Sequence, residues 1–116
     1  MAAYLDLEIE RGATYTCEVL AVDDDTRAAI DLTDYTARMM IKRSTSEAEA
    51  LLELTTGNGR IIITVGTGSV MIYLTAIETA ALDWARGVYD LELVSIGGEV
   101  TRLIEGAVTV LANVTV

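Results

Sequence analysis

Strict alternation of apolar and charged side chains constrains this fold more than any other feature of the sequence. In residues 4–10, "YLDLEIE", Leu5, Leu7 and Ile9 face one way and the acidic residues between them face the other. A period of two is typical of a half-buried strand. Eight or nine such segments follow one another with turn signals between them, and none alternates regularly with a helix. The pattern predicts an all-β fold, either an antiparallel β-sandwich or a compact barrel, and we expect an Ig-like sandwich.

Glycines mark the turns between the predicted strands. "GTG" stands between the apolar runs "RIIITV" and "SVMIYLT", which is a hairpin signal. Gly97 and Gly98 stand between "GVYDLELVSI" and "EVTRLIEG". Because glycine adopts positive φ without a steric penalty, these two residues predict a two-residue hairpin turn.

One short helix is predicted at about residues 76–84, within "LTAIETAALDWARGVYDLEL". Thr75 is a good N-cap, and Glu78 three residues later completes a capping box. Gly87 is expected to end the helix. The apolar residues at helical spacing, which would form one buried face, are Ile77, Ala80, Ala81 and Trp84. We expect this helix to close one end of the sandwich with Trp84 as a plug, and the alternative is a ligand pocket under Trp84.

Length and charge limit the class of protein. The chain has 116 residues, which suits a single domain spanning residues 1–116. Eight basic and 18 acidic residues give a net charge of -10. We expect no nucleic-acid partner, because phosphate binding needs a basic face. The nearest basic cluster, Arg38, Lys42 and Arg43, is interpreted as solvated charge.

The apolar content favours association. Hydrophobic residues make up 52% of the chain, and a small domain has difficulty burying so much apolar surface alone. We therefore expect a homo-oligomer. Cys17 is the only cysteine, so no intrachain disulfide is possible, which fits a reducing cytoplasm. We see no signal peptide, and no apolar run approaches the ~18 residues of a membrane span.

Residue types for catalysis or metal binding are mostly missing. Histidine is absent, which removes Ser-His-Asp and Cys-His nucleophile systems and His-bearing zinc sites. The acidic run at residues 23–25 lacks the spacing of a calcium loop. Asp90 and Glu92 lie two apart on one strand, without the aromatic sugar platforms of a glycoside hydrolase, and are interpreted as a solvated face. We expect no enzyme, no cofactor, no metal and no small-molecule substrate.

The order of these segments resembles a known family. "IDLTDYTARMMIKR", followed by "GRIIITVGTGSVMIYLTAIETAALDWARGVYDLELVSIGGEVTRLIEGAVTV", resembles small bacteriophage and prophage structural proteins and the N-terminal domain of phage baseplate upper proteins. In that family a "T-A-x-E-T-A-A-L" helix precedes "Y-D-L-E-L", a glycine hairpin and "V-T-R-L-x-x-G-x-V-x-V". The resemblance covers residues 30–110 well and implies a virion protein without catalytic activity.

The sequence departs from the family pattern mainly near its C-terminal end. Leu111-Ala112-Asn113 stands where the family tends to have Ser-Pro-Glu, and the chain ends in "VTV". Asp34 stands where the family often has glycine, and aspartate tolerates the turn geometry. The predicted last strand, "AVTVLANVTV", is therefore more apolar, and an exposed edge of this kind invites association. The candidate interface residues are Leu111, Val114 and Val116.

These observations lead to one main hypothesis and one alternative. The main hypothesis is a non-enzymatic phage or prophage structural protein that assembles with itself and with other virion proteins in a tail, baseplate or neck. It would be made in the bacterial cytoplasm and enter the virion on assembly, with no membrane partner. The alternative is a carbohydrate- or receptor-binding β-sandwich module, which a cluster of exposed aromatic residues would support. The five tyrosines are spread over different predicted strands.

Overall fold

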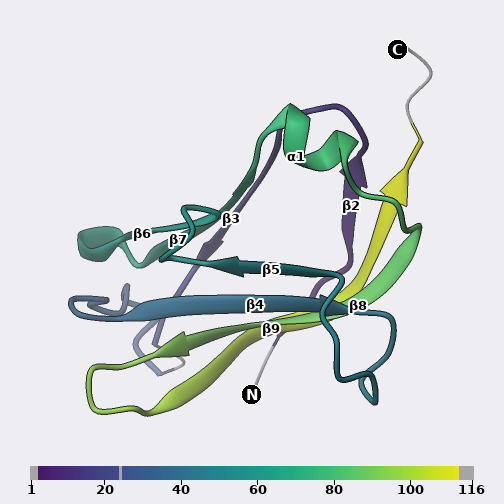
Figure 1. Ribbon diagram of the computed structural model, residues 1–116. Coiled ribbons are helices and arrows are strands. Elements are labelled where there is room, and N and C mark those ends of the chain that lie inside the picture. The colour runs from purple at the N-terminus through teal and green to yellow at the C-terminus, as the bar shows by residue number, and fades with distance from the viewer. Residues whose placement is uncertain (1–2, 24, 113–116) are drawn as a thin grey trace.

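Two β-sheets pack face to face in the computed structural model, which describes residues 3–23 and 25–112 (Figure 1). The larger sheet has the order β1-β9-β8-β4-β5, with β2 also paired to β9, and the smaller sheet has the order β3-β7-β6. The described elements are β1 (Ala3–Tyr4), β2 (Leu7–Glu10), β3 (Tyr15–Leu20), β4 (Thr36–Lys42), β5 (Leu52–Thr55), β6 (Ile61–Thr64), the 3-10 helix η1 (Val65–Thr67), β7 (Ser69–Leu74), α1 (Ala76–Ala80), β8 (Arg86–Val94) and β9 (Val100–Leu111). The predicted all-β sandwich is confirmed, and the Ig-like arrangement stays a prediction.

The core lies between the two sheets and follows the predicted alternation. In β4, Ala37, Met39 and Ile41 are buried, while the residues between them are exposed. Because successive side chains of a strand point to opposite faces, one face of β4 fills the core and the other faces solvent. Leu32, in the segment that crosses from the smaller to the larger sheet, is also fully buried.

The first strands pair with the last strand in parallel, unlike the other pairs. Segment 4–10 is divided at residues 5 and 6, so β1 and β2 are separate strands. Leu7 lies opposite Val108 and Glu10 opposite Leu111, in parallel register. The predicted antiparallel sandwich therefore includes a parallel pairing at this edge. Sequence alternation predicts which face of a strand is buried but says nothing about the direction of its neighbour.

Gly106 allows the break between β1 and β2 to lie close to β9. A Cβ atom at residue 106 would stand 2.2 Å from the carbonyl oxygen of Leu5, which no side chain can accept without movement. The Tyr89 hydroxyl donates a hydrogen bond to the same oxygen at 2.5 Å. The Asp6 carboxylate accepts a hydrogen bond from the Ala107 N–H at 3.0 Å, which replaces the strand hydrogen bond lost at the break. The N-terminal segment is therefore fixed to β9 through its backbone.

The β8–β9 hairpin forms where it is predicted, but its turn is longer. The Gly98 N–H bonds the Ser95 carbonyl at 3.0 Å, and the Ser95 N–H bonds the Glu99 carbonyl at 2.9 Å. The loop therefore has three residues, Ile96, Gly97 and Gly98, of which Gly98 has a φ of 89°. The prediction of a two-residue Gly97-Gly98 turn is wrong, because only the last glycine needs positive φ.

The last two predicted strands are one. β9 runs without interruption from Val100 to Leu111, with one register irregularity opposite Leu91 and Glu92 of β8. Of the three candidate interface residues, Leu111 is 40% exposed at the end of β9. Val114 and Val116 lie outside the described residues.

The helix is shorter than predicted, and the apolar face predicted for it is not buried. α1 begins with the expected capping box, but it ends at Ala80 instead of residue 84, and Gly87 lies in β8. Ile77 is 84% exposed, and Ala80 and Ala81 are exposed as well. The predicted face of Ile77, Ala80 and Ala81 is therefore wrong. Trp84 does lie in the core, 5% exposed, but it comes from the segment after the helix.

The burial of Thr79 determines which face of α1 points to the core. Its side chain is fully buried, and its hydroxyl donates to the Ala13 carbonyl at 2.8 Å and accepts from the Gly12 N–H at 3.0 Å. Residues 77 and 79 lie about 200° apart around a helix, so burying Thr79 turns Ile77 to solvent. The helix is thus tied to the turn between β2 and β3 by hydrogen bonds at one end of the sandwich (Figure 1).

Trp84→Ala should lower the free energy of unfolding by about 3–5 kcal/mol, because the substitution leaves a cavity in the core. Urea denaturation followed by circular dichroism measures the change. Ile77→Ala is the matched control from the same segment and should change stability by less than about 0.5 kcal/mol, since its side chain faces solvent. Similar losses in the two variants would mean that Ile77 is buried after all.

Gly106→Ala should lower the free energy of unfolding by about 1–3 kcal/mol, because the new methyl group displaces the Leu5 backbone. The same denaturation experiment measures it, and hydrogen exchange at the β2 amides reports whether that strand is loosened. Gly66→Ala is the control, since nothing lies within 4 Å of a Cβ atom there. If the two variants are equally stable, the close approach of Leu5 does not constrain residue 106.

Candidate assembly surfaces

Asp90 and Glu92, the carboxylates predicted to lie two apart on one strand, form ion pairs with residues of the neighbouring strands. Glu92 Oε1 of β8 lies 2.9 Å from Arg38 Nε of β4, and Asp90 Oδ2 lies 3.5 Å from Arg102 Nε of β9. Lys42 of the predicted basic cluster lies on the same outer face of β4, whereas Arg43 begins the following loop. This face is a charged strand surface with partners of opposite sign.

Cation-binding groups are not gathered in the part of the chain that the structure describes. No three Asp, Glu or Cys side chains there are grouped so that they could hold a metal ion. Asp23 instead shapes a turn, since its Oδ1 accepts from the N–H groups of Thr26 at 3.0 Å and Asp25 at 2.9 Å. These hydrogen bonds hold the pKa of Asp23 below its usual range. Asp24 lies outside the described residues.

The tyrosines do not favour the carbohydrate-binding alternative. Tyr4 is exposed on β1, and Tyr89 is buried with its hydroxyl on Leu5. Burial raises the pKa of Tyr89 above its ordinary value, so the hydroxyl stays protonated and can donate. The other tyrosines are half-buried on three different elements or loops: Tyr15, Tyr35 and Tyr73. These positions form no exposed aromatic platform.

α1 is far too short to cross a membrane. It has five residues, and no helix among the residues described is both long enough and apolar enough to cross a membrane.

Cys17, on β3, is a free thiol and half-buried.

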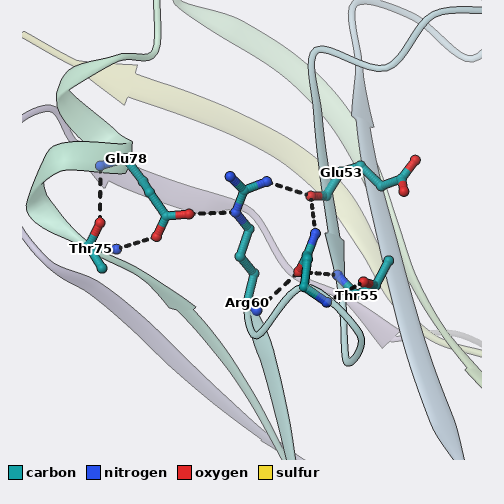
Figure 2. A network of polar contacts seen from close by, with 6 residues as sticks. Glu53, Thr55, Arg60, Thr75 and Glu78 are labelled. Carbon is teal, nitrogen blue, oxygen red and sulfur yellow. Dashed lines mark hydrogen bonds and ion pairs between the residues drawn. The ribbon is translucent and has the colours of Figure 1, made fainter.

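A polar network joins α1 to the place where the chain leaves the larger sheet for the smaller one (Figure 2). Arg60 lies at its centre, directly before β6, and its Nε donates to Glu78 Oε2 at 2.5 Å. Its second donor group bonds the Glu53 carbonyl of β5 at 2.9 Å. Asn58 closes the β5–β6 turn by accepting from the Thr55 N–H at 3.0 Å and donating to the same Glu53 carbonyl at 3.0 Å. The Arg60 guanidinium therefore connects the helix with the larger sheet, while the Arg60 carbonyl bonds Tyr73 of the smaller sheet.

Glu78 has two partners and a shifted pKa. Its Oε1 accepts from the Thr75 N–H at 2.9 Å, while Arg60 occupies its other oxygen. The Thr75 hydrogen bond, and after it the Arg60 hydrogen bond, lower the pKa of Glu78 below its ordinary value. The capping-box pattern predicted the first partner. Nothing in the local sequence pointed to the second, because Arg60 is 18 residues away.

The free edge of β6, which we call the β6 edge, has no charged residue. Among edge strands of four or more described residues, β2, β3 and β5 each contain glutamate, whereas β6 reads Ile-Ile-Ile-Thr. The Tyr73 N–H bonds the Arg60 carbonyl at 2.8 Å, so residue 60 faces β7. Alternation along an antiparallel pair then directs the backbone groups of Ile61 and Ile63 to the free side, where Ile61 is buried and Ile63 is half-buried. Ile62 is 44% exposed. The charged side chains that prevent association at the edge strands of many natural proteins are absent from β6.

Hollows open on the surface formed by the described residues, and two of them are well defined. One, of about 510 Å³, lies between the edge of β3 and the first half of β9, with Val19, Leu20 and Leu103 in its wall and Asp23 and Asp25 at its rim. The other, also about 510 Å³, lies on the outer face of the larger sheet over β4, β8 and β9. Sequence alternation predicted that these outer residues face solvent, but not that the face is hollowed.

Glu78→Gln should lower the free energy of unfolding at neutral pH by about 1 kcal/mol, the typical contribution of an N-terminal cap. Because the folded-state pKa of Glu78 is lowered, its contribution is present above the ordinary glutamate pKa and is lost as the pH falls through the folded-state value. The difference between wild type and variant should therefore shrink in acid. Urea denaturation across a pH series measures it, with the exposed loop variant Glu47→Gln as control.

A wild-type advantage over Glu78→Gln that stays constant, or grows, as the pH falls would contradict the assignment of Glu78 as an ionised cap. The Glu47→Gln protein should follow wild type within about 0.5 kcal/mol throughout.

Comparison with known proteins adds no further constraint to these surfaces. The chain matches no protein-family model and no curated protein. The β6 edge and the outer face of the larger sheet are the surfaces that bear on function.

Proposed function

We propose that the protein is a non-enzymatic structural component of a phage or prophage particle, in a tail, baseplate or neck. It assembles through protein–protein contacts as a homo-oligomer and with other virion proteins. The β6 edge is the observation that carries the proposal. The resemblance of residues 30–110 to phage structural proteins supports the setting, and the ion-paired state of Asp90 and Glu92 fits a protein whose surface is used for contact.

The β6 edge offers both parts of a strand contact. Ile63, which is half-buried, directs its backbone donor and acceptor to the free side, where a strand of another chain can pair them as β7 pairs its neighbours on the other side. Ile62 and Val65, 44% and 46% exposed, place apolar side chains beside that edge. Pairing would satisfy the backbone groups and remove apolar surface from water, which are the two terms that favour association at an edge.

The charge of the chain limits where contacts form. A net charge of -10 keeps separate copies apart in solution and keeps assemblies soluble. β6 has no charged residue, so a neighbouring strand meets little repulsion along it. Association through such an edge is selective, because most other approaches bring acidic surfaces together.

Light scattering with mass determination tests the proposal at micromolar concentrations. We expect a mass of two or more chains at roughly tens of micromolar, and a clean monomer there would contradict self-assembly.

Ile62→Lys should lower the average mass, because a lysine beside the β6 edge repels an identical edge and must be desolvated on pairing. Ile77→Lys is the matched control, since Ile77 is more exposed but lies on α1 away from any strand edge. Equal masses for the Ile62→Lys and wild-type proteins would exclude the β6 edge as a contact.

A further inference from the structure

The outer face of the larger sheet has rows of opposite charge on adjacent strands. Its β4 row contains Arg38 and Lys42, and its β8 row contains Asp90 and Glu92. The register places Arg38 opposite Glu92 and Met40 opposite Asp90. Met40, 39% exposed, lies between the two basic residues of its row.

The hollow on this face has no net charge, on a strongly acidic protein. The hollow over β4, β8 and β9 is lined by three basic residues, Arg38, Lys42 and Arg102, and by three acidic residues, Asp90, Glu92 and Glu105. The whole chain has eight basic and 18 acidic residues, which leaves five basic and fifteen acidic residues elsewhere. The net charge of -10 therefore lies outside the lining of this hollow.

A second copy fits the charge pattern of this face. Two chains of charge -10 repel each other in most orientations, and repulsion is smaller where two hollows with balanced charge face each other. In contrast, the hollow beside β3 is lined by two acidic residues, Asp23 and Asp25, and one basic residue, Arg102, so its charge is less balanced. A face with a basic row next to an acidic row is also complementary to itself, because a two-fold rotation exchanges the rows.

We propose that the outer face of the larger sheet docks a second copy of this chain about a two-fold axis that runs along the strands between β4 and β8. The inference rests on the proposed function and names one of its contacts. The axis lays the β4 row of each copy over the β8 row of the other. Arg38 of each copy therefore faces the partner's Glu92. Arg38 is 51% exposed in the single chain, and its guanidinium retains donors beyond the one bonded within the chain. Long side chains such as Met40 fill the facing hollows.

The test uses a charge exchange that preserves the pair within the chain. The double variant Arg38→Glu/Glu92→Arg keeps an ion pair between β4 and β8 but reverses both rows at this position. It should pair with itself as wild type does, and it should not pair with wild type, because like charges then face each other. Native mass spectrometry of a mixture with an isotope-labelled wild type distinguishes these species. All chains carry Ile62→Lys, which removes the β6 contact and leaves this face alone.

Single exchanges give the complementary result. Arg38→Glu and Glu92→Arg place like charges on adjacent strands and on facing copies, so each alone should dimerise at least tenfold more weakly. Mixed in equal amounts, the two should form a heterodimer, since every facing pair is then of opposite sign. Circular dichroism melting checks that each variant is folded, and the double variant decides the question if a single variant is not.

The outcomes separate this inference from the proposed function. If the double variant mixes freely with wild type, or if dimers in the Ile62→Lys background survive both single exchanges, this face is not the contact while self-assembly stands. A monomeric Ile62→Lys background with an oligomeric wild type overturns the face and leaves the β6 edge. A wild type that is monomeric at tens of micromolar overturns both.

Discussion

The pairing of the first strands with the last strand is the interaction on which the larger sheet depends. β9 bonds β8 on one side and both β1 and β2 on the other, so it connects segments about a hundred residues apart. Gly106 makes this possible, because only a residue without a side chain lets the Leu5 backbone approach β9. Tyr89 then fixes the same carbonyl from β8. Without these contacts the edge of β9 would be open and Leu7 and Ile9 would lose their place in the core.

The smaller sheet is tied to the larger one by polar contacts at two points. Arg60 bonds Glu78 of the helix and the Glu53 carbonyl of β5, directly where the chain crosses between sheets. Thr79 bonds the turn between β2 and β3, another place where the chain crosses between the sheets. A buried hydroxyl must be hydrogen-bonded, and Thr79 meets this requirement with backbone groups, so it orients the helix as well as stabilising it.

Much of the fold could be predicted because its signals are local. Alternation along β4 identifies the buried face, and the capping box of Thr75 and Glu78 marks where α1 begins. The helix face was misjudged because four apolar residues at helical spacing were given more weight than one threonine. Thr79 is buried through hydrogen bonds to a turn 66 or 67 residues away, which hydrophobicity cannot reveal. The parallel pairing of β2 was missed for the same reason, since it depends on long-range register.

The candidate surfaces could be predicted only in part. Composition and charge predicted association but not where it occurs. The apolar pattern placed the candidate interface at the C-terminal residues and not at β6. The β6 edge follows from strand order, which places Ile61–Thr64 at the end of a sheet. The rows on the outer face follow from register, which brings Arg38 beside Glu92 across 54 residues. The sequence identifies these residues one at a time. Only the pairing of the strands shows which of them lie side by side.

The parallel arrangement of β2 and β9 also has a mechanical consequence. A stretching force applied to the chain before β2 and after β9 pulls the two strands past each other along their length (Figure 1). Their hydrogen bonds, from the Leu7–Val108 pair to the Glu10–Leu111 pair, are then loaded in shear and must break together. An antiparallel pair at the same position would be peeled apart one bond at a time. This topology therefore suits a domain that transmits tension between neighbours.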